Sequence, residues 1–145
     1  MENIHKYEVN VAWTKDRKGI MSSPVLSQQI EVATPPDFPK GVPNIWSPEH
    51  LFVAAVNSCL MNTFFAVAEN SNLKYISFKS NAVGTVEKID GGYQVTEITL
   101  KPILEISDIE DSERAKRIIE MSEKNCLISK SVKTNIHLVP EIIVV

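Results

Sequence analysis

The long apolar run that begins at Ser47-Pro48-Glu49 and extends to about Asn70 constrains the fold more than any other feature of the sequence. Serine is a favoured helix N-cap, proline fits the first helical position, and glutamate in the first turn complements the helix dipole. These three residues therefore predict the start of a helix. Its apolar residues lie nearly all round the helix, which predicts burial on several sides. A chain of 145 residues would struggle to wrap such a helix alone, so we expect a partner subunit to cover part of it.

The length of this run also raises the question of a membrane span. Polar residues interrupt its apolar surface and basic flanks are missing, so we expect no contact with a membrane; the interrupting residues are Asn57, Ser58, Asn62 and Thr63. Residues 1–6 are polar and do not resemble the apolar part of a signal peptide. We therefore expect a cytoplasmic protein.

The segments before the helix predict β-structure and then a loop. Residues 6–15 alternate with a period of two, which predicts a strand, and Asp16-Arg17-Lys18-Gly19 predicts a turn. Residues 20–33 predict one or two returning strands, interrupted near Pro24. The four prolines of residues 35–43 exclude a regular helix or a central strand there.

The segments after the helix complete an α+β pattern. Residues 74–89 and 93–106 predict two strands joined at Asp90-Gly91-Gly92, a strong hairpin signal. Residues 109–124 predict a helix, and residues 133–145 predict a final strand whose proline indicates an edge position or a bulge. This order is typical of an α+β fold with an antiparallel sheet, and we expect one domain over residues 1–145.

Composition excludes several classes of function. The net charge of −3 and the scattered lysines argue against nucleic acid as a partner. No two of the histidines and cysteines have the close spacing of metal ligands, so we expect no metal. The sequence holds no glycine-rich phosphate loop, nucleophile elbow or HExxH motif, and we expect no cofactor.

The chain has two cysteines, Cys59 and Cys126. In a reducing cytosol such thiols are inert core residues, redox groups or metal ligands. Asn62 and Thr63 follow Cys59 at helical spacing, so Cys59 borders a polar stripe, which favours a reactive thiol over a small buried hydrophobe. Cys126 follows the second predicted helix, where a short helical piece is expected to start, and the alternative is an ordinary cysteine after a helix end.

Residues 47–60, SPEHLFVAAVNSCL, resemble the helix signature of the OsmC/Ohr family. That signature has an Asn/Ser-Pro-Glu start, a Leu-Phe/Ile pair, small residues, and a cysteine ten positions after the glutamate. The family's second cysteine stands in a Cys-Pro-x-Ser motif; here the residues are Cys126-Leu127-Ile128-Ser129, with leucine in place of proline. The resemblance covers essentially the whole chain.

The resemblance implies a thiol-dependent peroxidase that acts on organic hydroperoxides, with no metal. It also implies an intertwined homodimer built around the long central helix, with two sites at the subunit interface. In that scheme Cys59 attacks the peroxide, Cys126 resolves the sulfenic acid as a disulfide, and Arg17 and Glu49 complete the site. A small dithiol or a dithiol-bearing protein would then reduce the disulfide.

The chemistry of Cys59 requires a thiolate, and the dipole of its own helix cannot supply one because Cys59 lies about three turns inside that helix. The family's Arg-x-Gly in the first hairpin makes Arg17 the candidate for the missing positive charge; the alternative is a solvated turn residue. Glu49 could hold Arg17 as an ion pair or be an ordinary first-turn charge. Glu49 and Cys59 are about 15 Å apart on one continuous helix. Either the helix is broken between them or Glu49 reaches the site from the other subunit.

Two other functions stay open from the sequence. The leucine after Cys126 and the proline-rich loop favour a redox sensor or binding protein with little turnover. A purely structural dimer, with both cysteines in the core, is the third possibility.

Overall fold

The computed structural model describes residues 3–145. These residues form two compact units, one up to Leu51 and one from Phe52 to Val145. The single domain expected for residues 1–145 stays a prediction.

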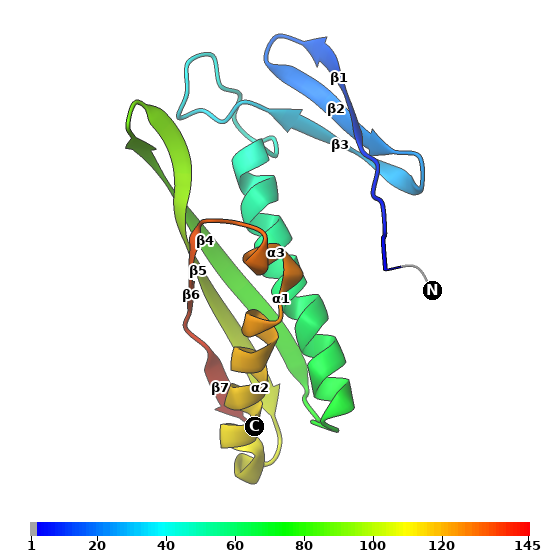
Figure 1. Ribbon diagram of the computed structural model, residues 1–145, viewed down its shortest axis with the longest axis vertical. Coiled ribbons are helices and arrows are strands. Elements are labelled where there is room, and N and C mark those ends of the chain that lie inside the picture. Colours follow the sequence, from blue (N-terminus) through cyan, green and yellow to red (C-terminus); the bar gives the residue numbers. More distant parts are fainter. Residues whose placement is uncertain (1–2) are drawn as a thin grey trace. The chain divides into compact units, whose positions relative to one another are not determined.

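The first unit contains a three-stranded antiparallel sheet of order β1-β2-β3 (Figure 1). The strands are β1 (Asn10–Lys15), β2 (Lys18–Ser23) and β3 (Leu26–Ala33). Asp16 adopts a positive φ of 52° in the β1–β2 turn, a conformation that Asp tolerates better than most residues. The turn expected at residues 16–19 is shorter than predicted, because Lys18 and Gly19 already belong to β2. The interruption expected near Pro24 is confirmed, since β2 ends at Ser23 and β3 begins at Leu26.

One face of this sheet is apolar. The register places Val11, Met21 and Ile30 side by side on neighbouring strands, and Trp13 and Val32 lie on the same face two residues further along β1 and β3. Trp13 is 77% exposed and Val11 68% exposed. Large apolar side chains with that exposure are unusual in a row on one sheet face.

The proline-rich loop, residues 34–46, is fixed by backbone hydrogen bonds. The amide of Ala33 donates to the carbonyl of Trp46 (2.9 Å), and that of Val42 donates to the carbonyl of Thr34 (2.8 Å). The amide of Thr34 also donates to the carbonyl of Arg17 at 3.3 Å, which ties the loop to the β1–β2 turn. The loop holds no helix or strand, as its prolines predict.

Helix α1 (Pro48–Asn70) begins where the sequence predicts. The Ser47 hydroxyl accepts a hydrogen bond from the His50 amide at 3.1 Å, the N-cap interaction expected of serine. Within one chain a single stripe of the helix is fully buried, formed by Val56, Leu60, Phe64 and Ala68. Several other apolar side chains of α1 stay partly exposed, including Phe65. The sequence predicts burial on several sides of this helix, and within the described chain this stripe is the part that is fully buried.

By length and composition α1 is the one helix among the described residues that could cross a membrane, and 22% of its most apolar stretch is buried inside the chain. The core helix of a soluble protein meets the same criterion. The Asn57 side chain of α1 donates a hydrogen bond to the carbonyl of Ser80 at 2.9 Å. A polar side chain of this helix therefore helps to hold the helix against the adjacent sheet.

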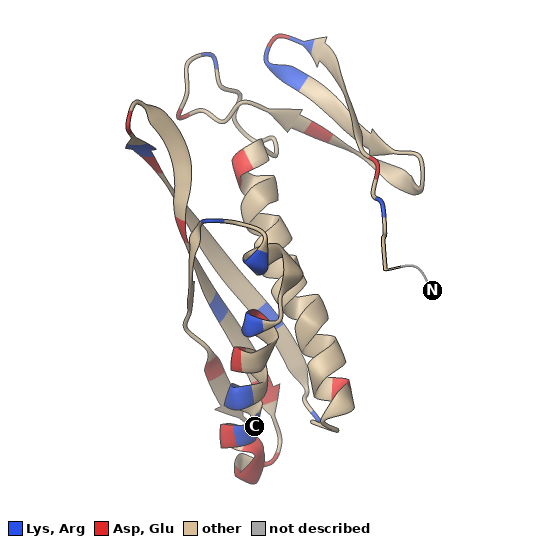
Figure 2. Cartoon of the chain, in the orientation of Figure 1, with Lys and Arg blue, Asp and Glu red and all other residues tan. Residues whose placement is uncertain are grey.

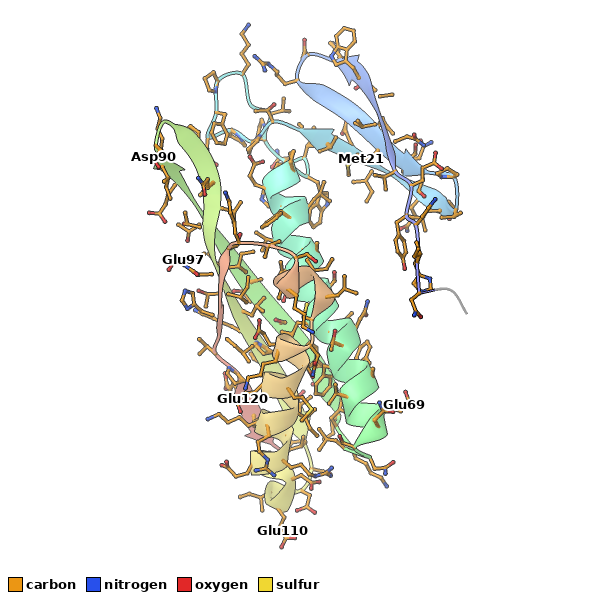
Figure 3. The ribbon with its side chains drawn as sticks, viewed as in Figure 1. Met21, Glu69, Asp90, Glu97, Glu110 and Glu120 are labelled. Atoms are coloured by element: carbon orange, nitrogen blue, oxygen red, sulfur yellow. The ribbon has the colours of Figure 1, made fainter. Side chains whose placement is uncertain are left out.

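That sheet belongs to the second unit and is mixed. Its long hairpin pairs β4 (Ser77–Ile89) with β5 (Gly92–Ile106) in antiparallel register. Asp90 lies at the tip (Figure 3). Asp90 and Gly91 have φ values of 50° and 84°, and two consecutive positive φ angles are characteristic of a type I′ turn. The hairpin that the sequence predicts at this point is confirmed.

The C-terminal segment differs in detail from the expected single strand. It forms two short strands, β6 (Asn135–Leu138) and β7 (Glu141–Val144), separated at Pro140, which cannot donate a ladder hydrogen bond. Both run parallel to β5, where an antiparallel sheet was expected. The reason is the crossover: helix α2 (Ser112–Lys124), preceded by the turn η1 (Ile109–Asp111), returns the chain to the start of β5.

The core of the second unit lies between its sheet and its helices. Alternate residues of β5 are fully buried, and most of them pack against buried side chains of α1 and α2; the buried residues are Ile98, Leu100, Pro102, Leu104 and Ile106. Helix α1 approaches β4 closely at Gly84, where an added Cβ atom would lie 2.5 Å from Cγ2 of Val53. An added methyl group at residue 84 would therefore force the Val53 side chain or the helix to shift.

Candidate active site

Cys59 lies in the middle of α1, next to the buried residue Leu60, and its side chain is half-buried. One helical turn further on, the Thr63 hydroxyl lies 3.9 Å from the Cys59 sulfur. The polar stripe predicted beside Cys59 therefore includes a hydroxyl group that faces the sulfur.

Cys126 lies at the N-cap of the one-turn helix α3 (Leu127–Lys130). Its backbone is extended (φ −69°, ψ 115°), and its carbonyl accepts a hydrogen bond from the Lys130 amide at 3.1 Å. The side chain of Cys126 is fully buried. The predicted short helix after α2 is thus confirmed, and it forms with leucine rather than proline as its first residue.

The fold brings the two cysteine side chains together. Both are free thiols, and they lie close enough for each to shift the pKa of the other. A buried thiol next to a second thiol in a chain with two cysteines is the arrangement that a reversible disulfide requires.

The environment of Cys59 favours its thiolate. Burial acts to raise its pKa, but hydrogen bonds outweigh this and hold the pKa of Cys59 below the ordinary value of a cysteine. The donors are the Cys126 thiol, the backbone amides of Ile128 and Leu127, and the Thr63 hydroxyl. Cys59 is therefore the more nucleophilic of the two thiols near neutral pH.

The environment of Cys126 has the opposite effect. Burial raises the pKa of the Cys126 thiol, and its hydrogen bond to Cys59 and the charge of a Cys59 thiolate raise it further. The Ser129 side chain and amide offset part of this increase. The pair is thus unequal: one sulfur is suited to be a thiolate and the other to be a thiol that donates a hydrogen bond to it.

The source of this stabilisation differs in part from the expectation. The sequence predicts a positive charge beside Cys59 and gives no sign of the backbone amides of residues 127 and 128. These amides come at the start of α3, where the first amides of a helix have no partner inside that helix. Leucine at residue 127 carries an N–H that proline would lack, so the departure from the family's Cys-Pro-x-Ser motif adds a donor.

Arg17 lies in the β1–β2 turn and is exposed. Among residues 3–145 no ion pair of its guanidinium occurs, although its carbonyl accepts the hydrogen bond from Thr34. The predicted partnership of Arg17 with Glu49 or Cys59 stays a prediction.

Glu49 lies in the first turn of α1, and one of its carboxylate oxygens is buried without a hydrogen-bond partner in the described part of the chain. Helix α1 is continuous from Pro48 to Asn70, so a break between Glu49 and Cys59 is wrong as an explanation. The two side chains are separated by about 15 Å of helix. One guanidinium cannot contact both residues of the same chain.

Within residues 3–145, no three His, Cys, Asp or Glu side chains cluster closely enough to hold a metal ion.

Comparison with known proteins gives a family and a fold. The family model described as OsmC-like protein matches residues 41–141. No curated protein matches the sequence. A solved OsmC-like protein of unknown function from Vibrio cholerae is similar at a TM-score of 0.83 and 23% identity, over 94% of this chain and 99% of that chain.

Two further solved structures are organic hydroperoxide resistance proteins. The one from Elizabethkingia anophelis is similar at a TM-score of 0.78 and 22% identity, over 100% of both chains. The one from Bacillus subtilis is similar at a TM-score of 0.67 and 20% identity, over 95% of this chain and 98% of that chain. At these identities the likeness establishes the α+β fold expected from the sequence.

Proposed function

The chain belongs to the OsmC-like protein family, and we propose that it is a thiol-dependent peroxidase that reduces organic hydroperoxides to alcohols. The observation that carries the proposal is the unequal pair, with the pKa of Cys59 lowered and that of Cys126 raised. Two of the similar solved structures are named as organic hydroperoxide resistance proteins, which supports the same class of substrate.

The proposed reaction has two steps at this pair. The Cys59 thiolate attacks the distal oxygen of the hydroperoxide, the O–O bond breaks, and the alkoxide leaves and takes up a proton to become the alcohol. Cys59 is then a sulfenic acid. The Cys126 sulfur, having lost its proton, attacks Cys59; hydroxide leaves, combines with the proton as water, and the Cys59–Cys126 disulfide remains.

Arg17 and Glu49 complete the site in this proposal, and they act from the partner subunit of a homodimer. The buried, unpartnered oxygen of Glu49 and the exposed guanidinium of Arg17 support a pairing that one isolated chain leaves unmade. The exposed apolar face of the β1-β2-β3 sheet and the partly exposed sides of α1 support the dimer itself.

The test of the proposed function is stopped-flow oxidation of the reduced protein by cumene hydroperoxide and by hydrogen peroxide, with mass spectrometry of the product. We expect rapid loss of both thiols to a Cys59–Cys126 bridge, faster with the organic peroxide and abolished in Cys59→Ser. Slow oxidation without preference and without a bridge would reject the peroxidase. A bridge that forms rapidly but gives no steady turnover with a dithiol would instead favour the redox sensor.

The origin of Arg17 can be tested with mixed dimers. Arg17→Ala keeps its cysteines and Cys59→Ser keeps its arginine, so each variant alone should be inactive. If Arg17 acts across the interface, co-expression of the two variants restores one complete site in the mixed dimer. If Arg17 acts within its own chain, the mixture stays inactive. The pair Glu49→Ala and Cys59→Ser tests Glu49 in the same way.

A further inference from the structure

The middle of helix α1 carries no charged side chain. Its two acidic residues, Glu49 and Glu69, lie near its ends, and the helix contains no lysine or arginine. Figure 2 shows the same pattern, since α1 is red near each end and tan between. Any side chain of α1 that assists the chemistry of Cys59 from the middle of the helix is therefore a neutral polar group.

Two neutral polar side chains, Asn62 and Thr63, follow Cys59 by three and four residues. On a helix these positions lie on opposite sides of Cys59, about 60° away for Asn62 and about 40° away for Thr63. Helical side chains lean toward the N-terminus of the helix, so both lean toward the turn that holds Cys59. The distance of 3.9 Å between the Thr63 hydroxyl and the Cys59 sulfur agrees with this arrangement. The thiol is thus bordered by an amide on one side and a hydroxyl on the other.

The two sides of Cys59 differ in exposure. Thr63 is half-buried, whereas Asn62 is exposed. Among residues 3–145 the Asn62 side chain forms no hydrogen bond. Ser58, another exposed polar residue of this helix, uses its hydroxyl to donate to the Ala55 carbonyl at 3.4 Å. Asn62 therefore presents an amide that is available to a substrate on the exposed side of the thiol.

This exposure decides from which side a hydroperoxide reaches Cys59. On the inner side, Ile128 of α3 packs against the buried cluster that contains Leu60, and Cys126 just before α3 is fully buried. The substrate therefore approaches from the outer side, beside Asn62. The attacking sulfur, the attacked oxygen and the leaving oxygen must be aligned, so the leaving oxygen lies beyond the attacked one. Cβ atoms three residues apart on a helix are about 5–6 Å apart, which puts the Asn62 amide within reach of that oxygen.

We propose that Asn62 is a catalytic residue whose side-chain amide donates a hydrogen bond to the leaving oxygen of the hydroperoxide. This inference rests on the proposed function, because it assigns a role in that reaction. The leaving oxygen carries little charge in the bound hydroperoxide and a growing negative charge as the O–O bond breaks. A donor aimed at it stabilises the transition state more than the bound substrate, and so it raises the rate.

The step balances without ionisation of Asn62. The Cys59 thiolate forms a bond to the distal oxygen, which keeps its hydrogen, and the O–O bond breaks. Its electron pair stays on the proximal oxygen, to which the Nδ2–H group of Asn62 donates. The alkoxide then takes up a proton from water and leaves as the alcohol. The sulfur is oxidised to a sulfenic acid by two electrons, and the peroxide is reduced by the same two.

The test compares two oxidants that differ in their leaving group. tert-Butyl hydroperoxide releases tert-butoxide, a strong base that benefits from a hydrogen bond. Peracetic acid releases acetate, a weak base that benefits much less. In Asn62→Ala we expect the stopped-flow rate with tert-butyl hydroperoxide to fall about tenfold, as for the loss of one hydrogen bond to a developing charge. The rate with peracetic acid should fall much less, and equal losses with both oxidants would overturn the assignment.

Two further measurements separate an effect on the leaving oxygen from an effect on the sulfur. Alkylation of Cys59 by iodoacetamide has no oxygen leaving group and should be as fast in Asn62→Ala as in the unchanged protein. The midpoint of the thiolate titration, followed by ultraviolet absorbance, should also be unchanged. An amide does not ionise, so the loss with tert-butyl hydroperoxide should persist at alkaline pH. Slower alkylation or a shifted midpoint would mean that Asn62 acts on the sulfur, which would overturn the proposal.

The matched control is Ser58→Ala, which also replaces an exposed polar residue of α1 by alanine. Alanine is the best helix former, so both variants should fold, as circular dichroism would show. Ser58→Ala should keep the rates of the unchanged protein, because its hydroxyl is bound to the backbone of its own helix. Asn62→Gln keeps an amide and should react faster than Asn62→Ala with tert-butyl hydroperoxide. An equal loss in Ser58→Ala, or no gain in Asn62→Gln over Asn62→Ala, would count against Asn62.

The outcomes distinguish this inference from the proposed function. If the unchanged protein oxidises slowly with organic peroxides and forms no Cys59–Cys126 bridge, both are rejected. If the unchanged protein reacts rapidly and forms the bridge, but Asn62→Ala reacts just as fast with tert-butyl hydroperoxide, the role of Asn62 alone is rejected.

Discussion

The Cys59 sulfur lies 3.9 Å from the Thr63 hydroxyl oxygen, one turn further along α1. A hydroxyl at that distance donates a stronger hydrogen bond to a thiolate than to a neutral thiol. It therefore helps to lower the pKa of Cys59. The contact is long, and its contribution is about 0.5 kcal/mol. Thr63→Val should therefore slow the reaction with peroxide at neutral pH by about twofold. Thr63→Ser keeps the hydroxyl and should react like the unchanged protein; equal rates for all three would remove Thr63 from the site.

Leu127 supplies an amide that the family's proline lacks. Leu127→Pro should raise the pKa of Cys59, because one of the donors that lower it is removed. The backbone accepts proline here: residue 127 is the first of a helix, and Cys126 before it is already extended. We expect a slower reaction with peroxide at neutral pH, by up to about tenfold, since hydrogen bonds to charged groups contribute about 1.5 kcal/mol.

The matched control for this variant is Leu127→Ala, which shortens the side chain and keeps the amide. It should leave the pH dependence of the Cys59 thiolate unchanged, as measured by ultraviolet absorbance during pH titration. A shift of equal size in both variants would show that the side chain, and not the amide, matters for Cys59.

The hydrogen bond between the thiols predicts a pH profile. The rate with peroxide follows the thiolate fraction of Cys59, so it rises with pH and levels off below the pH expected for an ordinary cysteine. In Cys126→Ala the donated hydrogen bond is lost, the pKa of Cys59 rises, and the midpoint of the profile moves to higher pH. At neutral pH this should slow the first step by about fivefold, the equivalent of about 1 kcal/mol. At alkaline pH the two proteins should react at the same rate, which distinguishes a pKa effect from a damaged site.

Much of the fold is visible in the sequence because local signals and burial agree. Ser47-Pro48-Glu49 has three helix-start features at once, and the structure begins α1 at Pro48. Asp90-Gly91 permits the two positive φ angles that a tight hairpin needs. The direction of the last two strands has no such local signal. The direction depends on where the chain leaves α2, and that position is set by the packing of α2 against β5.

The meeting of the cysteines was predicted from the family pattern and not from local structure, because residues 67 positions apart have no shared local signal. The amides of residues 127 and 128 were missed for a related reason. A backbone amide is present at nearly every residue, so the side-chain types do not show which amides can donate a hydrogen bond to Cys59. The amides of residues 127 and 128 can do so because α3 starts at Leu127. The one clue was the absence of proline there. The roles of Glu49 and Arg17 stay predictions, because the described part of one chain gives neither side chain an ion pair.

The close approach of α1 to β4 predicts the cost of a single added methyl group. In Gly84→Ala the new Cβ would lie 2.5 Å from Cγ2 of Val53, so the helix or the side chain must shift. Overpacking of this kind costs about 1–3 kcal/mol, and we expect that loss in the free energy of unfolding measured with urea. Val53→Ala combined with Gly84→Ala should recover part of it, because the clashing methyl group is removed. Gly92→Ala is the matched control: its nearest neighbour would be 3.9 Å away, so stability should change little. If the Gly84→Ala protein were as stable as the original, α1 and β4 would not be closely packed at this point.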